Sequence, residues 1–408
     1  MKPQQTSAAT ISLERNVTAW TAIFLLYLAG CTTALHIGKI PAAIPLLQDV
    51  WQLSLTQSGL IISLHSILIA TCGLLLGLLI RRLGYVPFAI IGVGIVGVGS
   101  LLGSFAQSLP LLLVGRSIEG LGWIISVIVL PSLISALSTA KDRPLVMALW
   151  ASFLPVGAGM MLLYAPTLQS RGGWQLSWLF GSGVSFLAAI VVYLITRKYG
   201  RELSHLGATA GPWSFSDLTK RVVWLLSGCF LLYSFSYIPL ISFLPLLLVE
   251  TSHLTIGWAS SIAALVMLCN SVGSVSAGIF LRRGYSASKL LMIGAFGSGV
   301  CAVFIFAPFS TTGIRIIFAF AFSMFGGVVP GILFSTMPKA ASHPSSVGLL
   351  IGLMMQLAGI GMLLGGVVIP GTIEYFNAWI AAGWVTLITG SCCAFLAYLI
   401  GKQAFSLQ

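Results

Sequence analysis

The chain has 408 residues, of which 58% are hydrophobic and only 7% are charged. Soluble domains carry about 25% charged residues, so this composition excludes a protein whose whole surface faces water. The formal net charge is +12, but the basic residues stand in short clusters between apolar runs. That placement excludes the basic stripe with interleaved aromatics that is typical of nucleic-acid binding. Lipid is therefore the expected solvent of the fold.

Uninterrupted apolar runs of about 20 residues predict membrane-spanning helices. The sequence contains twelve such runs, and the polar stretch at about 198–221 divides them six and six. In chain order they cover about 18–40, 57–80, 87–106, 110–138, 146–167, 176–197, 222–249, 257–281, 289–308, 313–337, 347–371 and 379–401. We therefore predict an all-α membrane protein with an N-terminal bundle (1–200), a cytoplasmic linker (201–221) and a C-terminal bundle (222–408).

Lysine and arginine placement predicts the orientation, because cytoplasmic loops are enriched in these residues. With the N-terminus inside, most of the 20 basic residues fall on the cytoplasmic side. They are Lys2, Arg15, Arg81, Arg82, Lys141, Arg143, Arg197, Lys198, Arg201, Lys220, Arg221, Arg282, Arg283, Lys289, Lys339 and Lys402. We expect a multi-pass protein of the cell inner membrane with both termini in the cytoplasm.

The same basic turn occurs twice, as GLLIRRLGY from Gly77 and as GIFLRRGY from Gly278. Prolines and arginines align at nearly one offset: Pro45 with Pro245, 200 positions apart, and Arg116 with Arg315, 199 apart. The two halves are therefore predicted to be copies of one six-helix unit. Since six is an even number, both copies have the same orientation, related by an axis along the membrane normal.

Twelve helices in two parallel repeats, with a basic turn after helices 2 and 8, resemble the major facilitator superfamily. Gly77, Arg82 and Gly84 match the loop signature G-x-x-x-D-R-x-G of this family, while Arg81 replaces its aspartate and Tyr85 replaces a basic residue. RSIEGLG, from Arg116, matches the helix 4 signature R-x-x-x-G-x-G. Together with ALHIGKIPAAIPLLQ after helix 1, that segment most resembles the cyanate-permease and nitroimidazole-transporter branch.

The resemblance implies a cytoplasmic gate built from the two basic turns. Its residues are Gly77, Arg81, Arg82 and Gly84 in the first copy, and Arg282, Arg283 and Gly284 in the second. Both copies carry arginine where the family has the aspartate of a charge relay, so the usual relay lacks its carboxylate. Asp142, between Lys141 and Arg143, is expected to be a solvated loop charge.

Ionisable residues inside a membrane are expensive and usually functional. Arg116 and Glu119 lie three positions apart, on one face of helix 4. They either form an intrahelical ion pair that braces the helix, or face a cavity where Arg116 binds an anionic group and Glu119 exchanges a proton. Arg315 has Phe318 at the carboxylate position, and either reaches the outer interface or faces the same cavity.

Further polar and aromatic residues are candidates for substrate binding or for helix packing. His65 is either a second proton carrier or a hydrogen-bonded core histidine. Lys39 is expected simply to end the first span. The remaining substrate-binding candidates are His36, Trp123, Tyr233, Tyr237, Asn270 and Gln356.

These features predict a secondary transporter of a small organic solute that works by alternating access with proton coupling. Because Arg116 and Arg315 are both positively charged, the solute is expected to be anionic. The alternative is an exporter of drugs or metabolites; a non-transporting membrane enzyme or receptor is less favoured. The sequence contains no hydrolase, metalloprotease or P-loop motif, so we predict no enzyme.

Its seven cysteines lie in apolar runs without metal-ligand spacing. We expect no cofactor, no metal and no nucleic acid; the predicted partners are the solute, protons and lipid, with a monomeric chain.

Overall fold

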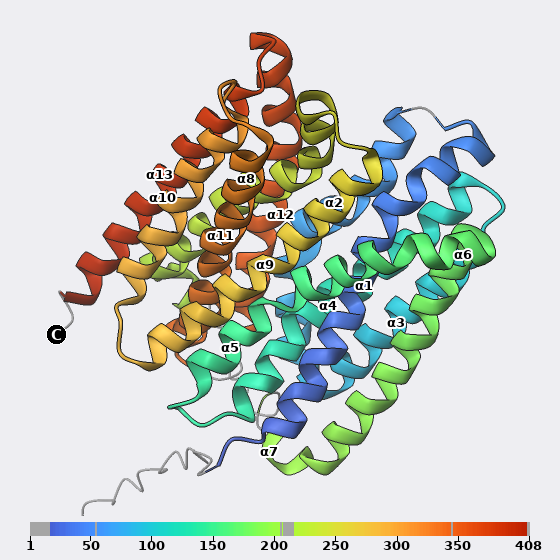
Figure 1. The fold of residues 1–408 in the computed structure, drawn as a ribbon. Coiled ribbons are helices and arrows are strands. Elements are labelled where there is room, and N and C mark those ends of the chain that lie inside the picture. Colours follow the sequence, from blue (N-terminus) through green and yellow to red (C-terminus); the bar gives the residue numbers. More distant parts are fainter. Residues whose placement is uncertain (1–16, 54, 205, 207–215, 344–345, 406–408) are drawn as a thin grey trace, which may run out of the picture.

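The computed structural model describes residues 17–405 except 54, 205, 207–215 and 344–345, and the described chain is helical throughout (Figure 1). Its elements are α1 (Trp20–Trp51), α2 (Leu55–Leu83), α3 (Tyr85–Ser104), α4 (Leu109–Ala136), α5 (Arg143–Ala151), α6 (Phe153–Lys198), α7 (Gly200–Ser204), the 3₁₀ turn η1 (Ser216–Thr219), α8 (Arg221–Ser252), α9 (Ile256–Arg282), α10 (Ala287–Phe306), α11 (Thr312–Ala340), α12 (Val347–Phe376) and α13 (Ile380–Phe405). The predicted linker, 201–221, lies partly outside the described residues.

Eleven helical units of the described chain are long and apolar enough to cross a membrane. Helices suit lipid because they satisfy every backbone donor and acceptor within one segment. The unit Arg143–Lys198 has 56 residues, or about 84 Å of helix, which is more than twice the hydrocarbon core. It reverses where Gly172 and Gly173 leave helical geometry, with Gly173 at φ 63°. The chain therefore crosses twelve times, in agreement with the sequence.

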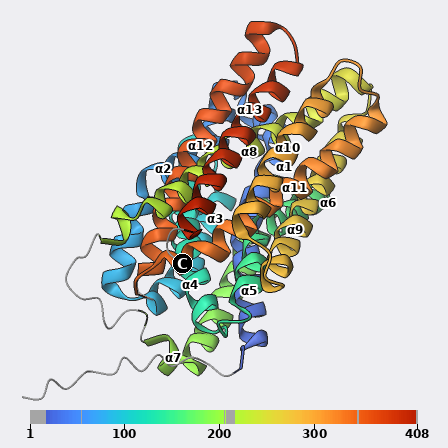
Figure 2. The same cartoon turned by 90° about the vertical axis from the view of Figure 1, so that its left-hand side faces the viewer.

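The crossings form two halves, α1 to α6 and α8 to α13, that meet along a seam (Figures 1 and 2). Equivalent helices end alike: Gln52 after α1 and His253 after α8 are both left-handed, at φ 51° and 53°. Pro131 inside α4 and Pro330 inside α11 also occupy matching positions. These repeated details support the predicted parallel duplication.

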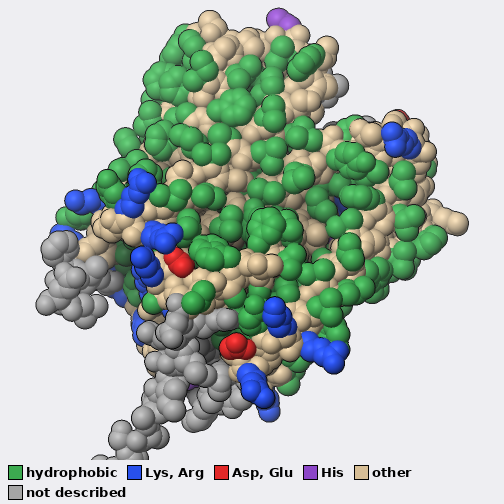
Figure 3. Space-filling model, turned by 60° about the horizontal axis from the view of Figure 1, so that its bottom comes forward, with side chains coloured by type: hydrophobic (Ala, Val, Ile, Leu, Met, Phe, Trp, Pro, Cys, Tyr) green, Lys and Arg blue, Asp and Glu red, His purple; other side chains and the backbone are tan. Residues whose placement is uncertain are grey.

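One end of the molecule is rich in lysine and arginine, and we call it the basic end (Figure 3). It comprises the last turns of α2 and α9, the α4–α5 turn and the start of α8, because antiparallel neighbours return to the same side. Its basic residues include Arg81, Arg82, Lys141, Arg143, Lys220, Arg282 and Arg283.

Small residues allow the helices to pack closely where lipid supplies no hydrophobic drive. A Cβ atom on Gly99 of α3 would lie 2.6 Å from the carbonyl oxygen of Gly115 on α4. Across the seam, a Cβ atom on Gly73 of α2 would lie 2.8 Å from the carbonyl oxygen of Gly352 on α12. The first approach brings polar side chains of α3 and α4 together, and the second closes the two halves against each other.

Candidate functional site

A cavity with about 560 Å³ of empty volume lies on the seam, between α4, α5 and α6 of the first half and α8, α9, α11 and α12 of the second. Its wall is mainly aromatic and methionine-rich. The aromatic and methionine residues are Trp123, Phe153, Phe230, Tyr233, Tyr237, Phe334, Met267, Met355 and Met362. The polar side chains of the lining are the two tyrosines, Trp123, Ser234 and Asn270, and no described lining residue carries a charge.

Asn270 organises the polar side of this cavity. Its Nδ2 donates to Tyr233 Oη and to the carbonyl oxygen of Ser323, both at 3.1 Å. The rings of Tyr233 and Tyr237 stack at 5.1 Å, and Tyr237 Oη lies 3.0 Å from Ser323 Oγ. The bonds join α8, α9 and α11, so the phenol rings are held in fixed positions against the cavity.

Trp123 forms the opposite wall, on α4. Its ring meets His65 of α2 edge-on, with centroids 4.2 Å apart. Within the described structure, neither Trp123 Nε1 nor His65 Nε2 has a hydrogen-bond partner. Because buried donors are normally satisfied, the indole N–H of Trp123, which has no partner among the described residues, can donate to a solute in the cavity.

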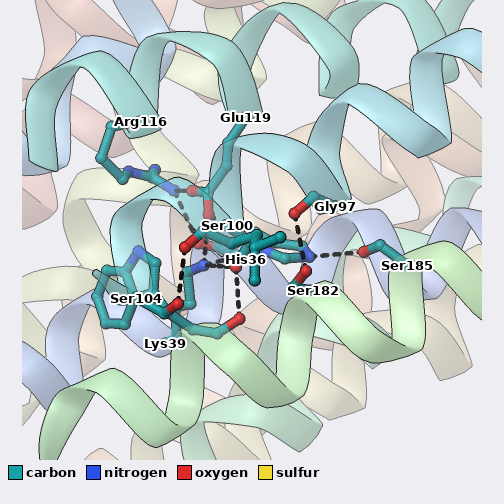
Figure 4. A network of polar contacts seen from close by, with 11 residues as sticks. His36, Lys39, Gly97, Ser100, Ser104, Arg116, Glu119, Ser182 and Ser185 are labelled. Atoms are coloured by element: carbon teal, nitrogen blue, oxygen red, sulfur yellow. Dashed lines mark hydrogen bonds and ion pairs between the residues drawn. The ribbon is translucent and has the colours of Figure 1, made fainter. Parts of the chain in front are cut away.

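A second site lies inside the first half, among α1, α3, α4 and α6, and we call it the charge cluster (Figure 4). It consists of His36, Lys39, Ser100, Arg116 and Glu119. The side chains of Lys39 and Glu119 are each only 1% exposed. Glu119 Oε1 accepts from Lys39 Nζ at 2.5 Å, and Glu119 Oε2 pairs with Arg116 Nη1. The intrahelical ion pair foreseen from the sequence is present, but a lysine from α1 joins it.

Lys39 is not the simple end of a span, because α1 continues for twelve residues to Trp51. An ammonium group has three donors, and Lys39 Nζ has three acceptors: Glu119 Oε1, Ser100 Oγ at 2.8 Å and His36 Nδ1 at 2.9 Å. This arrangement requires the His36 tautomer with its proton on Nε2, which then donates to Ser185 Oγ at 2.9 Å. The Lys39 ammonium also lies 4.4 Å from the ring centroid of Trp178.

The charge balance of this cluster is uneven. Two cations, Arg116 and Lys39, share one carboxylate, so the fully paired cluster carries a net charge of +1 when Lys39 is protonated. Buried charge is costly unless it is paired. A proton or a charged ligand that changes this balance would therefore change the stability of the surrounding helices.

The charge cluster is separate from the cavity but adjacent to it. Glu119 and Trp123 lie four positions apart on α4, which places them on the same face in successive turns. Trp123 lines the cavity, whereas none of the charged residues of the cluster does. Helix α4 thus connects a buried ionic site to the seam.

In the second half, the pocket equivalent to the charge cluster has no charged residue in its described lining. A pocket with about 310 Å³ of empty volume lies among α8, α10, α11 and α13, the helices equivalent to those around the charge cluster. Its polar lining comprises hydroxyl groups of Ser236, Ser298, Thr386, Thr389 and the two tyrosines. The repeat therefore holds ions in one half and hydroxyl groups in the other.

Arg315 is placed away from the cavity. Its guanidinium donates to the carbonyl oxygens of Ile305, Ala307 and Ser310 at 3.0–3.1 Å. Two of these residues stand at the end of α10, where carbonyl groups lack helical partners. With Phe318 in place of a carboxylate, Arg315 caps the neighbouring helix, whereas its counterpart Arg116 pairs with Glu119.

Gln356 also lies outside the cavity lining. Its Oε1 accepts from the backbone N–H of Leu74 at 3.0 Å, which joins α12 to α2 across the seam. The structure thus brings Trp123, Tyr233, Tyr237 and Asn270 to the cavity. It places His36, Arg116 and Glu119 in the charge cluster. His65 contacts the ring of Trp123.

At the basic end, the expected gate residues lie close to the seam. Gly84 and Gly284 make the turns, at φ 101° and 87°, and a Cβ atom on Gly77 would lie 3.1 Å from the carbonyl oxygen of Gly348. Arg282 Nη2 lies 3.0 Å from Asp142 Oδ1, which joins the two halves. Arg81 lies in the last turn of α2, and Arg82 and Arg283 are exposed.

The expectation that Asp142 is a solvated loop charge is wrong. Its side chain is only 15% exposed, and Thr18 Oγ1 donates to its Oδ2 at 2.7 Å. Close by, Ser335 Oγ of the second half donates to the carbonyl oxygen of Pro144 at 2.8 Å. Sequence reasoning missed this residue because its partners, Thr18 and Arg282, come from distant segments.

Twelve crossings in two parallel halves, with a cavity on the seam, form the architecture expected of a multi-pass membrane transporter. Residues 23–365 match the model of the Major Facilitator Superfamily. This match covers most of the chain, and the protein belongs to that superfamily of secondary transporters. The finer branch suggested by the sequence is not resolved by this match.

The names of two relatives give different cargoes. The chain is 25% identical over 289 residues to the multidrug efflux pump LfrA of Mycolicibacterium smegmatis, covering 68% of this chain but only half of that protein. It is 22% identical over 405 residues to the hexuronate transporter of Bacillus subtilis, covering 94% and 96% of the two chains. The structure of the proton:xylose symporter XylE superimposes with a TM-score of 0.75 at 15% identity, covering 93% and 95%. At that identity the last comparison speaks for the fold alone.

Proposed function

We propose that the protein is a proton-coupled secondary transporter of a small, largely uncharged aromatic or nitrogen-heterocyclic solute. The observation that carries this proposal is the seam cavity, whose wall is aromatic and whose described lining has no charged side chain. Aromatic faces suit a planar ring, and the free Trp123 N–H and the Asn270 amide supply a few directional polar contacts. Placement in the nitroimidazole-transporter branch would fit such a solute and forms part of the proposal.

An organic anion is the second candidate. It is favoured by the excess positive charge of the charge cluster, one helical turn from Trp123. The hexuronate transporter among the relatives supports the same direction, and the multidrug efflux pump supports the first candidate or an exporter. An anion would have to displace Glu119 from Arg116, or draw Arg116 toward the seam, because the arginine is already paired.

Proton coupling is proposed to depend on the charge cluster. Glu119 is the buried carboxylate of α4, and Lys39 and His36 extend its hydrogen bonds to Ser185 of α6. A change of protonation there alters the net charge beside the helix that carries Trp123. XylE is named as a proton symporter, which supports an ion-coupled cycle in a protein of this fold. His65 of α2, whose ring contacts Trp123, is a second proposed proton carrier.

The proposed topology places the basic end in the cytoplasm, with bundles at 1–200 and 222–408 in one monomer of the cell inner membrane. The accumulation of basic residues at that end supports it. The basic turns then form the cytoplasmic gate, with Asp142 and Arg282 as its ion pair. The two bundles would rock about the seam cavity, which alternates between the two sides.

Binding to the purified protein tests the solute class. We would compare nitrogen heterocycles with organic acids of equal size by thermal-shift measurements, in the parent protein and in Trp123→Ala and Asn270→Ala variants. The proposal expects heterocycles to raise the melting temperature of the parent and to lose this effect in both variants. Stabilisation by acids alone, unchanged in Trp123→Ala and lost in Arg116→Gln, would favour the anion candidate.

Transport by proteoliposomes tests the coupling. With a heterocycle identified by that screen, an imposed pH gradient should drive accumulation in the parent. Glu119→Gln should abolish the gradient-driven accumulation and retain exchange of labelled for unlabelled solute, because exchange needs the cavity but no net proton movement. Accumulation by Glu119→Gln at the parental level would contradict the assigned role of Glu119.

A further inference from the structure

Helix α12 begins at the basic end without a cap of its own. A helix leaves its first four N–H groups without intrahelical partners, and a serine at the N-cap position usually accepts from one of them. Ser346 stands at that position but makes no capping hydrogen bond. Its hydroxyl contributes instead to the hydrogen bonding of Asp217, ahead of α8.

The missing acceptor comes from the other half of the molecule. The backbone N–H of Gly348, the second residue of α12, donates to Tyr85 Oη at 3.1 Å. Tyr85 begins α3 and is only 1% exposed, so this bond is buried in the seam. A Cβ atom at position 348 would lie 2.5 Å from Tyr85 Oη, so glycine is needed there for the close approach.

The other copy of the repeat lacks the equivalent of this contact. The counterpart of Tyr85 is Tyr285, which is 58% exposed and packs its ring against Phe280. The helix that it could cap is α5, whose second residue is Pro144. Proline has no N–H group, so α5 offers no donor at the position where α12 offers Gly348.

We infer that Tyr85 is a positioning residue of the transport cycle, whose hydroxyl caps α12 only while the basic end is closed. When the halves separate there, the Gly348 N–H and the Tyr85 hydroxyl exchange this bond for bonds to water. The cap therefore stabilises the closed basic end relative to the open one and sets the ratio of the two states. This inference rests on the alternating-access part of the proposed function.

Removing one neutral hydrogen bond should raise the ratio of open to closed basic ends about 5-fold. The measurement is double electron–electron resonance between spin labels at Leu83→Cys and Lys339→Cys, two exposed positions at the basic end of either half. The background lacks the seven natural cysteines. We would record the distance distribution in the parent, in Tyr85→Phe and in Tyr285→Phe, the matched control.

Tyr85→Phe should increase the ratio of the longer-distance to the shorter-distance population about 5-fold, while Tyr285→Phe leaves the distribution unchanged. Gly348→Ala, which forces the ring away from the helix, should shift it at least as far. A merely structural role for Tyr85 would lower the melting temperature without moving the populations. Two populations that neither Tyr85→Phe nor Gly348→Ala shifts would overturn the inference and leave alternating access intact. If every variant shows a single distance and the protein moves no solute, both the Tyr85 inference and alternating access would be overturned.

Discussion

Glu119→Gln is the most informative change in the charge cluster. It removes the only carboxylate that the described structure places between Arg116 and Lys39, and leaves two cations in a site where Lys39 is 1% exposed. Breaking a buried ion pair by removing one partner costs about 3–5 kcal/mol. Lys39 keeps its bonds to Ser100 and His36, so we expect the lower end, about 3 kcal/mol of unfolding free energy.

The charge balance makes a sharper prediction for the double variant. Lys39→Met alone leaves Arg116 paired with Glu119 and removes the net positive charge, so it should cost less than Glu119→Gln. Combining the two should cost less than the sum of the single changes by about 1–3 kcal/mol, because the second change relieves the first.

The assay is equilibrium unfolding in mixed micelles, followed by tryptophan fluorescence. The control is Glu374→Gln, the same chemical change at an exposed position, which should alter stability by less than about 0.5 kcal/mol. If Glu119→Gln behaves like Glu374→Gln, or if the double variant shows simple additivity, the cluster does not have the arrangement described here.

Four further outcomes are expected. Arg315→Met should destabilise the protein by about 2–3 kcal/mol, since three buried carbonyl groups lose a charged donor, yet leave the KM for solute unchanged; a large rise in KM at parental stability would return Arg315 to the cavity. Trp123→Phe keeps an aromatic ring, smaller than indole, but removes the N–H, so heterocycle affinity should fall about 5-fold in isothermal titration; unaltered affinity would deny the N–H a role. Burial raises the pKa of Asp217, but hydrogen bonds from Lys220 and from Ser342 outweigh it and lower that pKa from 3.8 to about 2. Because the folded pKa is depressed, Asp217 stabilises the fold above pH 3.8, and this contribution is lost as the pH falls toward 2; Asp217→Asn should flatten stability over that window, and an unchanged profile would refute the assignment. Finally, cysteines at Arg82 and Arg283 should react with an impermeant thiol reagent from the same, cytoplasmic side, and labelling from opposite sides would contradict the parallel repeat.

Most of the fold could be predicted from the sequence because a chain in lipid has few possible structures. Long apolar runs must be helices, and repeated prolines and arginines at one offset indicate a parallel duplication. The break at Gly172 and Gly173 falls in the polar gap, with Arg171, that the sequence leaves between the spans 146–167 and 176–197. Similarity to solved structures then confirms the superfamily fold.

The site was only partly predictable, since spacing along one helix shows which residues share a face but not what lies opposite. Arg116 and Glu119 were correctly placed on one face of α4, but the third member, Lys39, comes from α1 and could not be paired from spacing. Arg315 looked equivalent to Arg116, yet the nearby end of α10 offers it carbonyl groups. Tyr85 was recognised as a departure from the family signature, but its acceptor role depends on a glycine 263 positions later.

The central claim is that the seam cavity opens alternately to the two sides of the membrane. It is tested most directly by labelling Asn270→Cys, a cavity residue, with an impermeant thiol reagent in oriented vesicles. The reagent should reach this cysteine from either side. Cross-linking Asp142→Cys to Arg282→Cys should then abolish labelling from the cytoplasmic side and preserve it from the other. Labelling that persists from the cytoplasm after cross-linking, or that never occurs from either side, would contradict the account.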